Sequence, residues 1–188
     1  MEIDYRIYRD LEKHIRTKVH SDFHANGSIG AMDFFCIIIW KSNRAKSKVA
    51  KRLFDSNLSL DERCHELTKR IYNEKTNKGK LKILFKEYKF RIPIMSAILS
   101  VLYPDDFTVY DFRVCESLKA RNENDFSKLE SLTNFDELWL RYSNYVEVVK
   151  RAIPLYNSLT EKDHYLWGQS FYSQLENHIK SNFANYKE

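Results

Sequence analysis

The sequence predicts an all-α protein, and three observations favour that class. Only 4 Gly and 3 Pro occur among 188 residues, so the many tight turns of a β-sandwich or barrel have little support. Apolar residues recur at helical spacing in most segments. The β-branched run at Ile37–Ile39 suggests a strand, but no second run of similar character exists to pair with it. Because no internal repeat or low-complexity linker appears, we expect one compact domain over residues 1–188.

The first half of the chain is expected to form helices joined by short breaks. An amphipathic helix is predicted over residues 3–18, followed by a polar loop from His20 to Gly30. From Ala31 to about Phe54, an apolar segment continues into a helix with a basic face. Ser59 reads as the N-cap of a helix that runs to a break at Asn73–Gly79.

The remaining elements follow from the same signals. Lys80–Tyr88 is predicted as a helix, and Pro93 suits the first turn of the next one, Ile94–Tyr103, which is apolar on all sides and so belongs in a core. A short helix is expected to run through Leu118. Two longer amphipathic helices are predicted over 134–151 and 161–183, the second with Thr160 and Asp163 as a capping box. Their apolar positions are Phe135, Leu138, Tyr142, Tyr145 and Val149 in the first and Leu166, Tyr172, Leu175 and Ile179 in the second.

Cysteine usage and hydropathy exclude several classes of protein. The 3 cysteines lie far apart, so neither a disulfide framework nor a cysteine-built metal site is expected. The longest apolar run, Phe34 to Trp40, is far shorter than the roughly 20 residues that cross a membrane, and the N-terminus has no apolar signal core. We therefore expect a soluble cytoplasmic monomer without a membrane partner.

A metal or other cofactor is not expected. The pair His20-x-x-x-His24 has the spacing of two metal ligands on a helix, but it lies in the predicted loop and has no evident third ligand. No phosphate-binding glycine motif or nucleophile elbow occurs.

Positive charge is concentrated in two segments, residues 41–52 and 75–91. These basic segments hold 13 of the 31 Lys and Arg residues but only 1 of the 26 acidic ones, so they carry a net +12 while the other 159 residues carry −7. Such a distribution is typical of a protein that contacts a polyanion on one side. Lysine-rich helices are also often merely solvated, but two such segments together favour nucleic acid as the partner.

Residues 80–118 combine a basic helix, a short connection, a buried helix and a lone acid in an aromatic frame, Tyr110-Asp111-Phe112-Arg113. This stretch resembles the helix-hairpin-helix DNA glycosylases. In that family, a hairpin Leu-Pro-Gly-Val-Gly and a helix with Thr-Ala or Ser-Ala precede Val-Asp-Thr-His-Val, whose Asp is catalytic. Ser96-Ala97 takes the Thr-Ala place here, and residues 109–114 take the place of the acid-bearing segment.

The resemblance implies a helical fold with a cleft between two subdomains, a helix-hairpin-helix segment at about 80–104 and a catalytic loop at 105–114. It also implies flipping of a damaged or modified base out of double-stranded DNA. Trp40-Lys41 and Tyr165-Leu166-Trp167 resemble flanking helices of small relatives. Met95 stands where the bifunctional members carry a Schiff-base lysine, so the resemblance implies hydrolysis to an abasic site without strand cleavage.

Asp111 is the candidate catalytic carboxylate, because a carboxylate stabilises the positive charge that develops on the sugar as an N-glycosidic bond breaks. An Asp ahead of a helix also serves as an N-cap, and Asp105 and Asp106 are rival acids that read as turn residues. The aromatic candidates for base binding are Tyr110, Phe112, Trp40 and Trp167. The candidates for phosphate contact are Lys41, Arg44, Lys48, Lys89, Arg91 and Arg113.

One departure from the family pattern affects the hairpin. Its glycine positions are occupied by Arg91 and Pro93, so the glycine amides that would approach a phosphate closely are absent. The leading hypothesis is a DNA glycosylase that serves base-excision repair or attacks hypermodified phage DNA as an antiviral defence. The alternatives are a glycosylase-like protein that only binds DNA, and an all-α interaction module without a nucleic-acid role.

Overall fold

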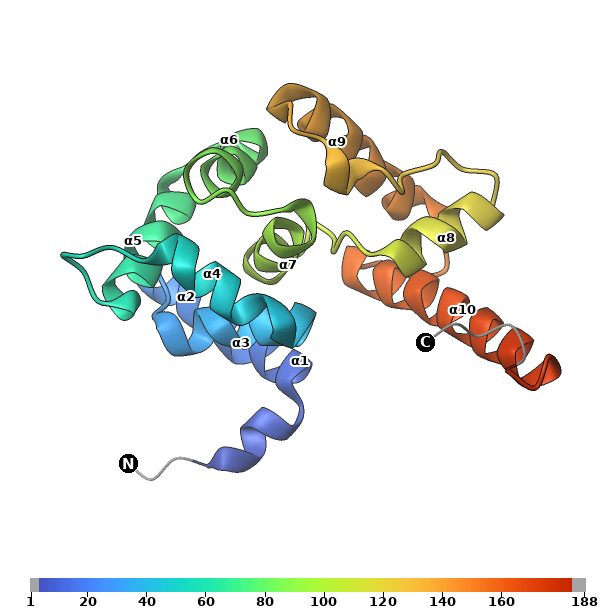
Figure 1. Ribbon diagram of the computed structural model, residues 1–188, viewed down its shortest axis with the longest axis horizontal. Helices are drawn as coiled ribbons and strands as arrows, with labels where there is room; N and C mark the ends of the chain where they lie inside the picture. Colours follow the sequence, from blue (N-terminus) through green and yellow to red (C-terminus); the bar gives the residue numbers. More distant parts are fainter. Residues whose placement is uncertain (1–3, 184–188) are drawn as a thin grey trace. The chain divides into compact units, whose positions relative to one another are not determined.

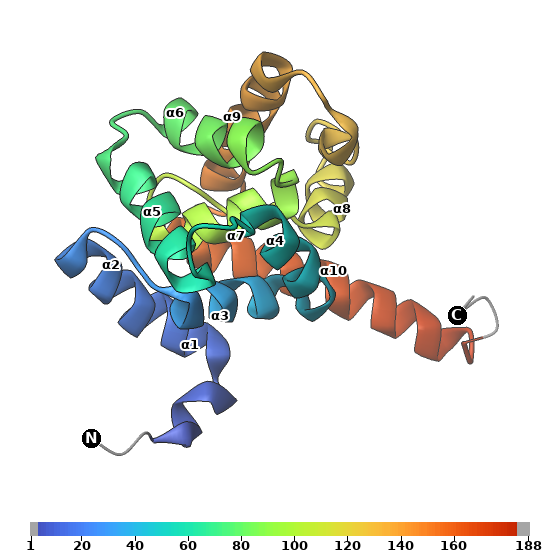
Figure 2. The same cartoon turned by 60° about the vertical axis from the view of Figure 1, so that its left-hand side comes forward.

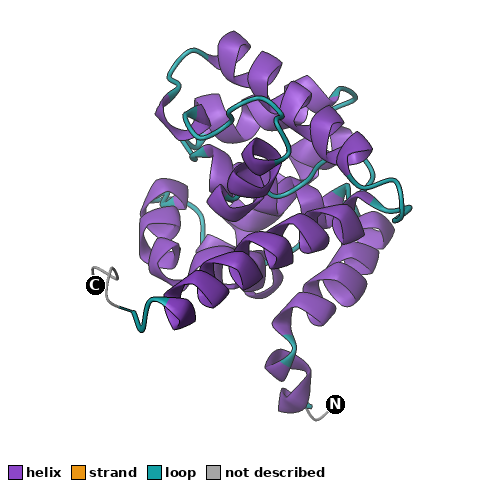
Figure 3. Ribbon diagram, turned by 90° about the vertical axis from the view of Figure 1, so that its right-hand side faces the viewer, coloured by secondary structure: helices purple, strands orange, loops and turns teal. Residues whose placement is uncertain are grey.

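The computed structural model describes residues 4–183, which are helical with no strand in that range (Figure 3). The all-α class is confirmed. The chain divides into two compact units, an N-terminal unit that ends at Phe107 and a C-terminal unit that begins at Thr108 (Figure 1). The single domain expected over residues 1–188 stays a prediction. No described helix is long and apolar enough to cross a bilayer.

The N-terminal unit holds seven α-helices and four 3-10 or π-helical turns among its described residues. In chain order these are η1 (Tyr5–Arg9), α1 (Leu11–His14), η2 (Ile15–Val19), α2 (His20–Asn26), α3 (Ala31–Ser42), η3 (Asn43–Ala45), α4 (Lys46–Leu53), α5 (Leu60–Asn73), α6 (Asn77–Lys82), η4 (Ile83–Glu87) and α7 (Ile92–Leu102). The turns η2 and η4 are π-helical, and each continues the helix before it.

Helix α7 is the core of this unit. Nine of its residues are buried, and its first turn contains Pro93. Helix α3 packs against both α5 and α7 (Figure 2). The predicted interior position of an all-round apolar helix is therefore confirmed.

Two predictions about the first elements need correction. Residues 20–26 form α2 rather than a loop, because His20 and His24 bond the carbonyl oxygens of Val101 (2.9 Å) and Leu102 (2.8 Å) at the end of α7. The loop is only residues 27–30. The predicted helix over 3–18 is divided among η1, α1 and η2, and residue 3 lies outside the described residues.

The C-terminal unit packs α8 (Phe112–Ala120), η5 (Leu129–Ser131), α9 (Phe135–Ala152) and α10 (Leu159–Lys180). Helix α10 contacts both α8 and α9. The predicted apolar positions of α9 are buried, including Tyr142 and Tyr145. In contrast, the stripe on the second half of α10 is exposed at Tyr172, Leu175 and Ile179.

The start of α10 also differs from the prediction. Ser158 and Glu161 form the capping box, two residues before the predicted pair of Thr160 and Asp163. Asp163 is instead buried, and its carboxylate accepts a hydrogen bond of 3.0 Å from the Thr108 hydroxyl. A buried carboxylate needs such a partner, so Asp163 holds the beginning of the C-terminal unit.

Candidate functional site

Asp111 lies at the end of a non-helical segment, residues 107–111, which precedes α8. Its backbone is extended, and its side chain accepts a hydrogen bond of 3.0 Å from the Arg113 N–H as the N-cap of that helix. The capping role weighed for Asp111 is thus present. The residue is partly exposed.

Buried tyrosines fix the segment that carries Asp111. A buried segment outside helices and sheets must satisfy its backbone groups by other hydrogen bonds. The Tyr142 hydroxyl donates to the Thr108 carbonyl (2.7 Å), and the Tyr145 hydroxyl donates to the Val109 carbonyl (2.8 Å). Both rings come from α9. Two successive carbonyls before Asp111 are therefore held by one helix, which sets the direction in which the chain enters α8.

Tyr110 completes this tyrosine network. Its ring is 2% exposed, its hydroxyl donates to the Phe126 carbonyl at 2.7 Å, and it packs edge-on against Tyr145. Burial raises the pKa of Tyr110 and of Tyr145 above the ordinary tyrosine value, so these hydroxyls stay protonated and donate. A ring in this position offers no face to a base, and we assign Tyr110 to the support of the segment rather than to base binding.

An exposed aromatic and cationic cluster lies beside Asp111 in the sequence and in the fold. The Arg113 guanidinium lies over the ring of Phe112 at 5.1 Å, over Trp167 at 5.2 Å and over Phe171 at 5.3 Å. Trp167 and Phe171 stack nearly parallel, with their centroids 5.4 Å apart. All three rings are exposed, by between 41% and 59%. The structure therefore brings together Phe112, Arg113 and Trp167, and Asp111 is the N-cap of the helix that carries the first two.

Polar partners hold this aromatic–arginine cluster. The Arg113 guanidinium donates to the Gln174 side-chain oxygen at 2.7 Å, and the Gln174 amide donates to Glu116. The Ser170 hydroxyl donates to the same Glu116 carboxylate at 2.9 Å. Sequence reasoning missed Phe171 and Gln174. They follow Trp167 by four and seven residues in the predicted helix over 161–183. This spacing places all three on one helix face and could have identified them.

The other predicted site residues belong to the N-terminal unit. Trp40 is partly exposed and lies under the Arg16 guanidinium at 5.0 Å. Lys41 is also partly exposed, at the end of α3. The remaining predicted phosphate contacts are exposed, namely Arg44, Lys48, Lys89 and Arg91.

The two basic segments adjoin within this unit, because the Arg52 guanidinium of α4 donates to the Lys89 carbonyl. One lysine of the basic segments is withdrawn from the surface. Lys80 is 6% exposed, its ammonium donates to the Glu74 carbonyl at 2.6 Å, and it lies over the Tyr103 ring at 4.7 Å. Burial lowers the pKa of Lys80 below the ordinary lysine value.

The connection between η4 and α7 takes a different form from a glycine hairpin. Arg91 is the N-cap of α7 in ordinary extended geometry, with φ of −89°, and its carbonyl accepts the N–H of Met95 at 3.0 Å. The left-handed residue is Lys89, with φ of 54°. The residue with left-handed backbone geometry is thus Lys89, two positions before Arg91, which stands at the first glycine position of the hairpin pattern.

Groups of three or more metal-ligating side chains are not found among the described residues. Comparisons of the chain with models of protein families, with curated proteins and with solved structures found no match.

Proposed function

We propose that the protein is a DNA glycosylase of the monofunctional type, with Asp111 as its catalytic carboxylate. The observation that carries the proposal is the setting of Asp111. A partly exposed carboxylate ends a segment held by buried tyrosines, and exposed aromatic rings and an arginine flank it. The helix-hairpin-helix resemblance of residues 80–114 supports the same reading and implies a glycosylase fold.

The chemistry follows from the charge that the reaction creates. As the N-glycosidic bond breaks, positive charge develops on the sugar, and the Asp111 carboxylate stabilises it or takes a proton from the attacking water. Water attacks the sugar carbon, the base leaves, and an abasic site remains. The Arg113 N–H bond to the carboxylate fixes its orientation before substrate arrives.

The exposed rings and the basic segments supply the binding functions that such an enzyme requires. A base that leaves the duplex must be stacked on an apolar face, and Phe112, Trp167 and Phe171 present such faces in the unit that holds Asp111. The exposed cations of the basic segments are suited to DNA phosphates in the duplex. The substrate is therefore proposed to be double-stranded DNA with a damaged or modified base, excised in repair or in defence against phage.

A second candidate function is DNA binding without catalysis. The capping bond from Arg113 N–H gives Asp111 a structural role that requires no chemistry. Arg91 and Pro93 occupy the two glycine positions of the hairpin pattern, so this connection would contact DNA phosphates differently from a glycine hairpin.

The two candidates are separated by assaying abasic sites on duplexes that contain uracil, alkylated bases or naturally modified phage bases. The Asp111→Asn variant retains an oxygen that accepts the Arg113 N–H, so the cap survives while the carboxylate is lost. The matched control is Asp125→Asn, because Asp125 accepts the Ser127 N–H at 2.9 Å in a similar local contact. We expect product from the wild type and from the control, and a fall of at least about 100-fold in Asp111→Asn.

Equal product from Asp111→Asn and the wild type would overturn the assigned role. DNA binding without product on any of the duplexes would favour the binding-only protein. Affinity for DNA that does not fall steeply with added salt would remove both nucleic-acid functions and leave an interaction module.

A further inference from the structure

The loop between α2 and α3, residues 27–30, contains two of the four glycines of the chain on either side of Ser28. Gly27 ends α2 in left-handed geometry, with φ of 72°. At Gly30, a Cβ atom would lie 2.6 Å from an Asp61 carboxylate oxygen and 3.1 Å from His65 Nε2. The absence of a side chain at Gly30 therefore lets the carboxylate and the imidazole lie against the loop.

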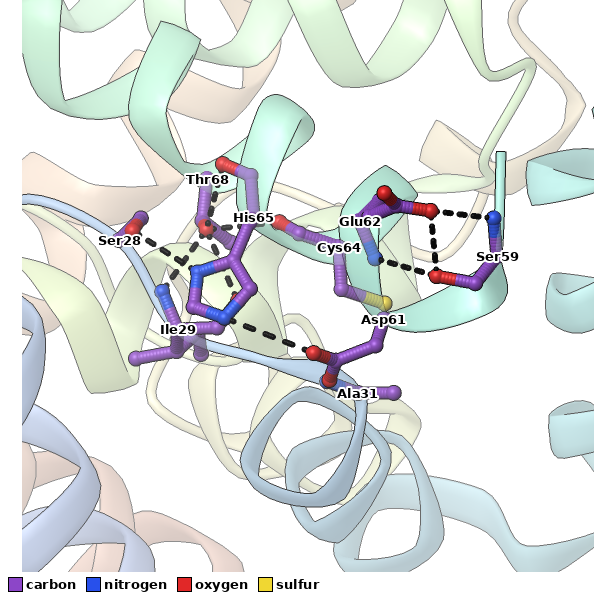
Figure 4. Close-up of polar contacts among 9 residues, drawn as sticks. All are labelled: Ser28, Ile29, Ala31, Ser59, Asp61, Glu62, Cys64, His65 and Thr68. Carbon is purple, nitrogen blue, oxygen red and sulfur yellow. Dashed lines mark hydrogen bonds and ion pairs between the residues drawn. The ribbon is translucent and has the colours of Figure 1, made fainter. Parts of the chain in front are cut away.

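Ser28, His65 and Asp61 form a chain of polar contacts (Figure 4). The Ser28 hydroxyl lies 2.9 Å from His65 Nδ1. On the other side of the ring, His65 Nε2 lies 3.7 Å from Asp61 Oδ2. The other oxygen of Asp61 accepts the Ala31 N–H at 2.7 Å, which fixes the carboxylate with one oxygen toward the imidazole. In the tautomer that carries its proton on Nε2, on the side of the Asp61 carboxylate, Nδ1 accepts the hydrogen bond of the Ser28 hydroxyl.

A buried threonine fixes the loop that carries Ser28. The Ile29 N–H donates to the Thr68 hydroxyl oxygen at 3.0 Å, and that hydroxyl lies 2.7 Å from the Cys64 carbonyl within α5. Thr68 is fully buried, and Ile29 is 2% exposed. The backbone next to Ser28 is thus tied to the same helix that carries Asp61 and His65. Ser28 itself is partly exposed, and the His65 side chain is 48% exposed, so a substrate can reach both.

We propose that Ser28 is an activated nucleophile that reacts with carboxylic esters, with His65 as its general base and Asp61 as the positioning residue. As Ser28 Oγ bonds to the acyl carbon, its proton passes to His65 Nδ1, and the Asp61 carboxylate stabilises the imidazolium. The ester C–O bond then breaks, and the leaving alcohol takes the proton from His65. Water, deprotonated by His65, next attacks acyl-Ser28, which releases the carboxylic acid and restores the serine.

Ser59 provides an internal comparison at the start of α5. Its hydroxyl also makes a short hydrogen bond, 2.7 Å, but to the Glu62 carboxylate within a capping box (Figure 4). That bond lowers the pKa of Glu62 below the ordinary glutamate value, so the carboxylate stays ionised and is a poor acceptor for a full proton. Ser59 is therefore held as a cap by a carboxylate, whereas the Ser28 hydroxyl faces a ring nitrogen of His65.

The test uses the full chain, a fluorophosphonate probe that forms an adduct with activated serines, and the ester p-nitrophenyl acetate. We expect the adduct on Ser28 by peptide mass spectrometry and none on Ser59. Adduct formation and ester cleavage should fall at least about 100-fold in Ser28→Ala and in His65→Gln. Asp61→Asn still accepts the Ala31 N–H, and its rate of ester cleavage should fall at least about 10-fold. Ser59→Ala should react like the wild type.

The proposal is overturned if Ser28 carries no adduct in protein whose far-UV circular dichroism matches that of the wild type. It is also overturned if His65→Gln reacts at the wild-type rate, or if Ser59 is labelled as fast as Ser28. Asp111→Asn should label normally, because no residue of this site belongs to the unit that holds Asp111. The result is thus independent of the outcome for base excision.

Discussion

The two units differ in charge and in how they hold their polar groups. The N-terminal unit carries 21 basic and 14 acidic residues, a net +7, and the C-terminal unit carries 10 basic and 12 acidic residues, a net −2. On α4 and around the 88–91 connection of the first unit, the basic side chains are mostly exposed. In the second unit, polar groups are buried in hydrogen bonds around the segment that leads to Asp111.

This difference suggests a division of labour under the proposed function. Exposed cations attract a polyanion over long distances, and this attraction changes little when a side chain moves. Their positions therefore need not be fixed by buried contacts. A reacting carboxylate requires a fixed position, and buried hydrogen bonds with full partners supply it. The first unit is accordingly suited to binding and the second to chemistry.

Charge reversal on α4 is expected to have the largest effect. In the triple variant Lys46→Glu, Lys48→Glu and Lys51→Glu, three exposed cations of α4 become acids. Affinity for duplex DNA should fall on the order of 100-fold at about 0.1 M salt, and the slope of log affinity against log salt should shrink by about three. Fluorescence anisotropy with a labelled duplex over a salt series measures both.

The matched control reverses three cations of the C-terminal unit, Lys119, Arg141 and Lys180, each of which pairs with a neighbouring acid. The change in net charge is the same, and the loss of affinity should be several-fold smaller. Equal losses in the two triple variants would show that net charge alone, rather than the basic segments, governs binding.

Removal of one tyrosine hydroxyl should have the next largest effect. Tyr145→Phe leaves the buried Val109 carbonyl without its donor, and the free energy of unfolding should fall by about 1–3 kcal/mol. Urea denaturation measures this change. Tyr172→Phe is the control because Tyr172 is 68% exposed, and it should change stability by less than about 0.5 kcal/mol. If both variants are equally stable, the tyrosine network does not hold the segment before Asp111.

The smallest expected effect is a gain in stability at Lys89. Because Lys89 has φ of 54°, Lys89→Gly should relieve left-handed strain and raise the free energy of unfolding by about 0.5–1 kcal/mol. Lys86→Gly, in the helical turn η4, should instead lower it by about 1 kcal/mol. Urea denaturation of the two variants compares them directly. A loss of stability in Lys89→Gly would contradict the left-handed geometry of the connection.

Local sequence signals predicted the elements that depend on local interactions. The N-cap at Ser59 and Pro93 in the first turn of α7 both appear in the structure as expected. Each of these depends on contacts within a few residues. Such contacts can be inferred from spacing and residue type alone.

The features that were missed depend on partners distant in the sequence. His20 and His24 belong to a helix whose polar side chains bond carbonyls 81 and 78 residues away. Asp163 is a buried acceptor for Thr108, 55 residues earlier, so its resemblance to a capping residue was misleading. The tyrosines of α9 were predicted as core residues, but the carbonyls that their hydroxyls would bind were not predictable from local pattern.

The central claim is that Asp111 performs the chemistry while other residues bind DNA. Single-turnover base excision, measured with protein in saturating excess over a modified duplex, tests it most directly together with anisotropy on the same samples. We predict that Asp111→Asn binds the duplex with wild-type affinity and excises at least about 100-fold more slowly. The α4 triple variant should bind weakly but approach the wild-type rate at saturation. Excision by Asp111→Asn at the wild-type rate would contradict the account.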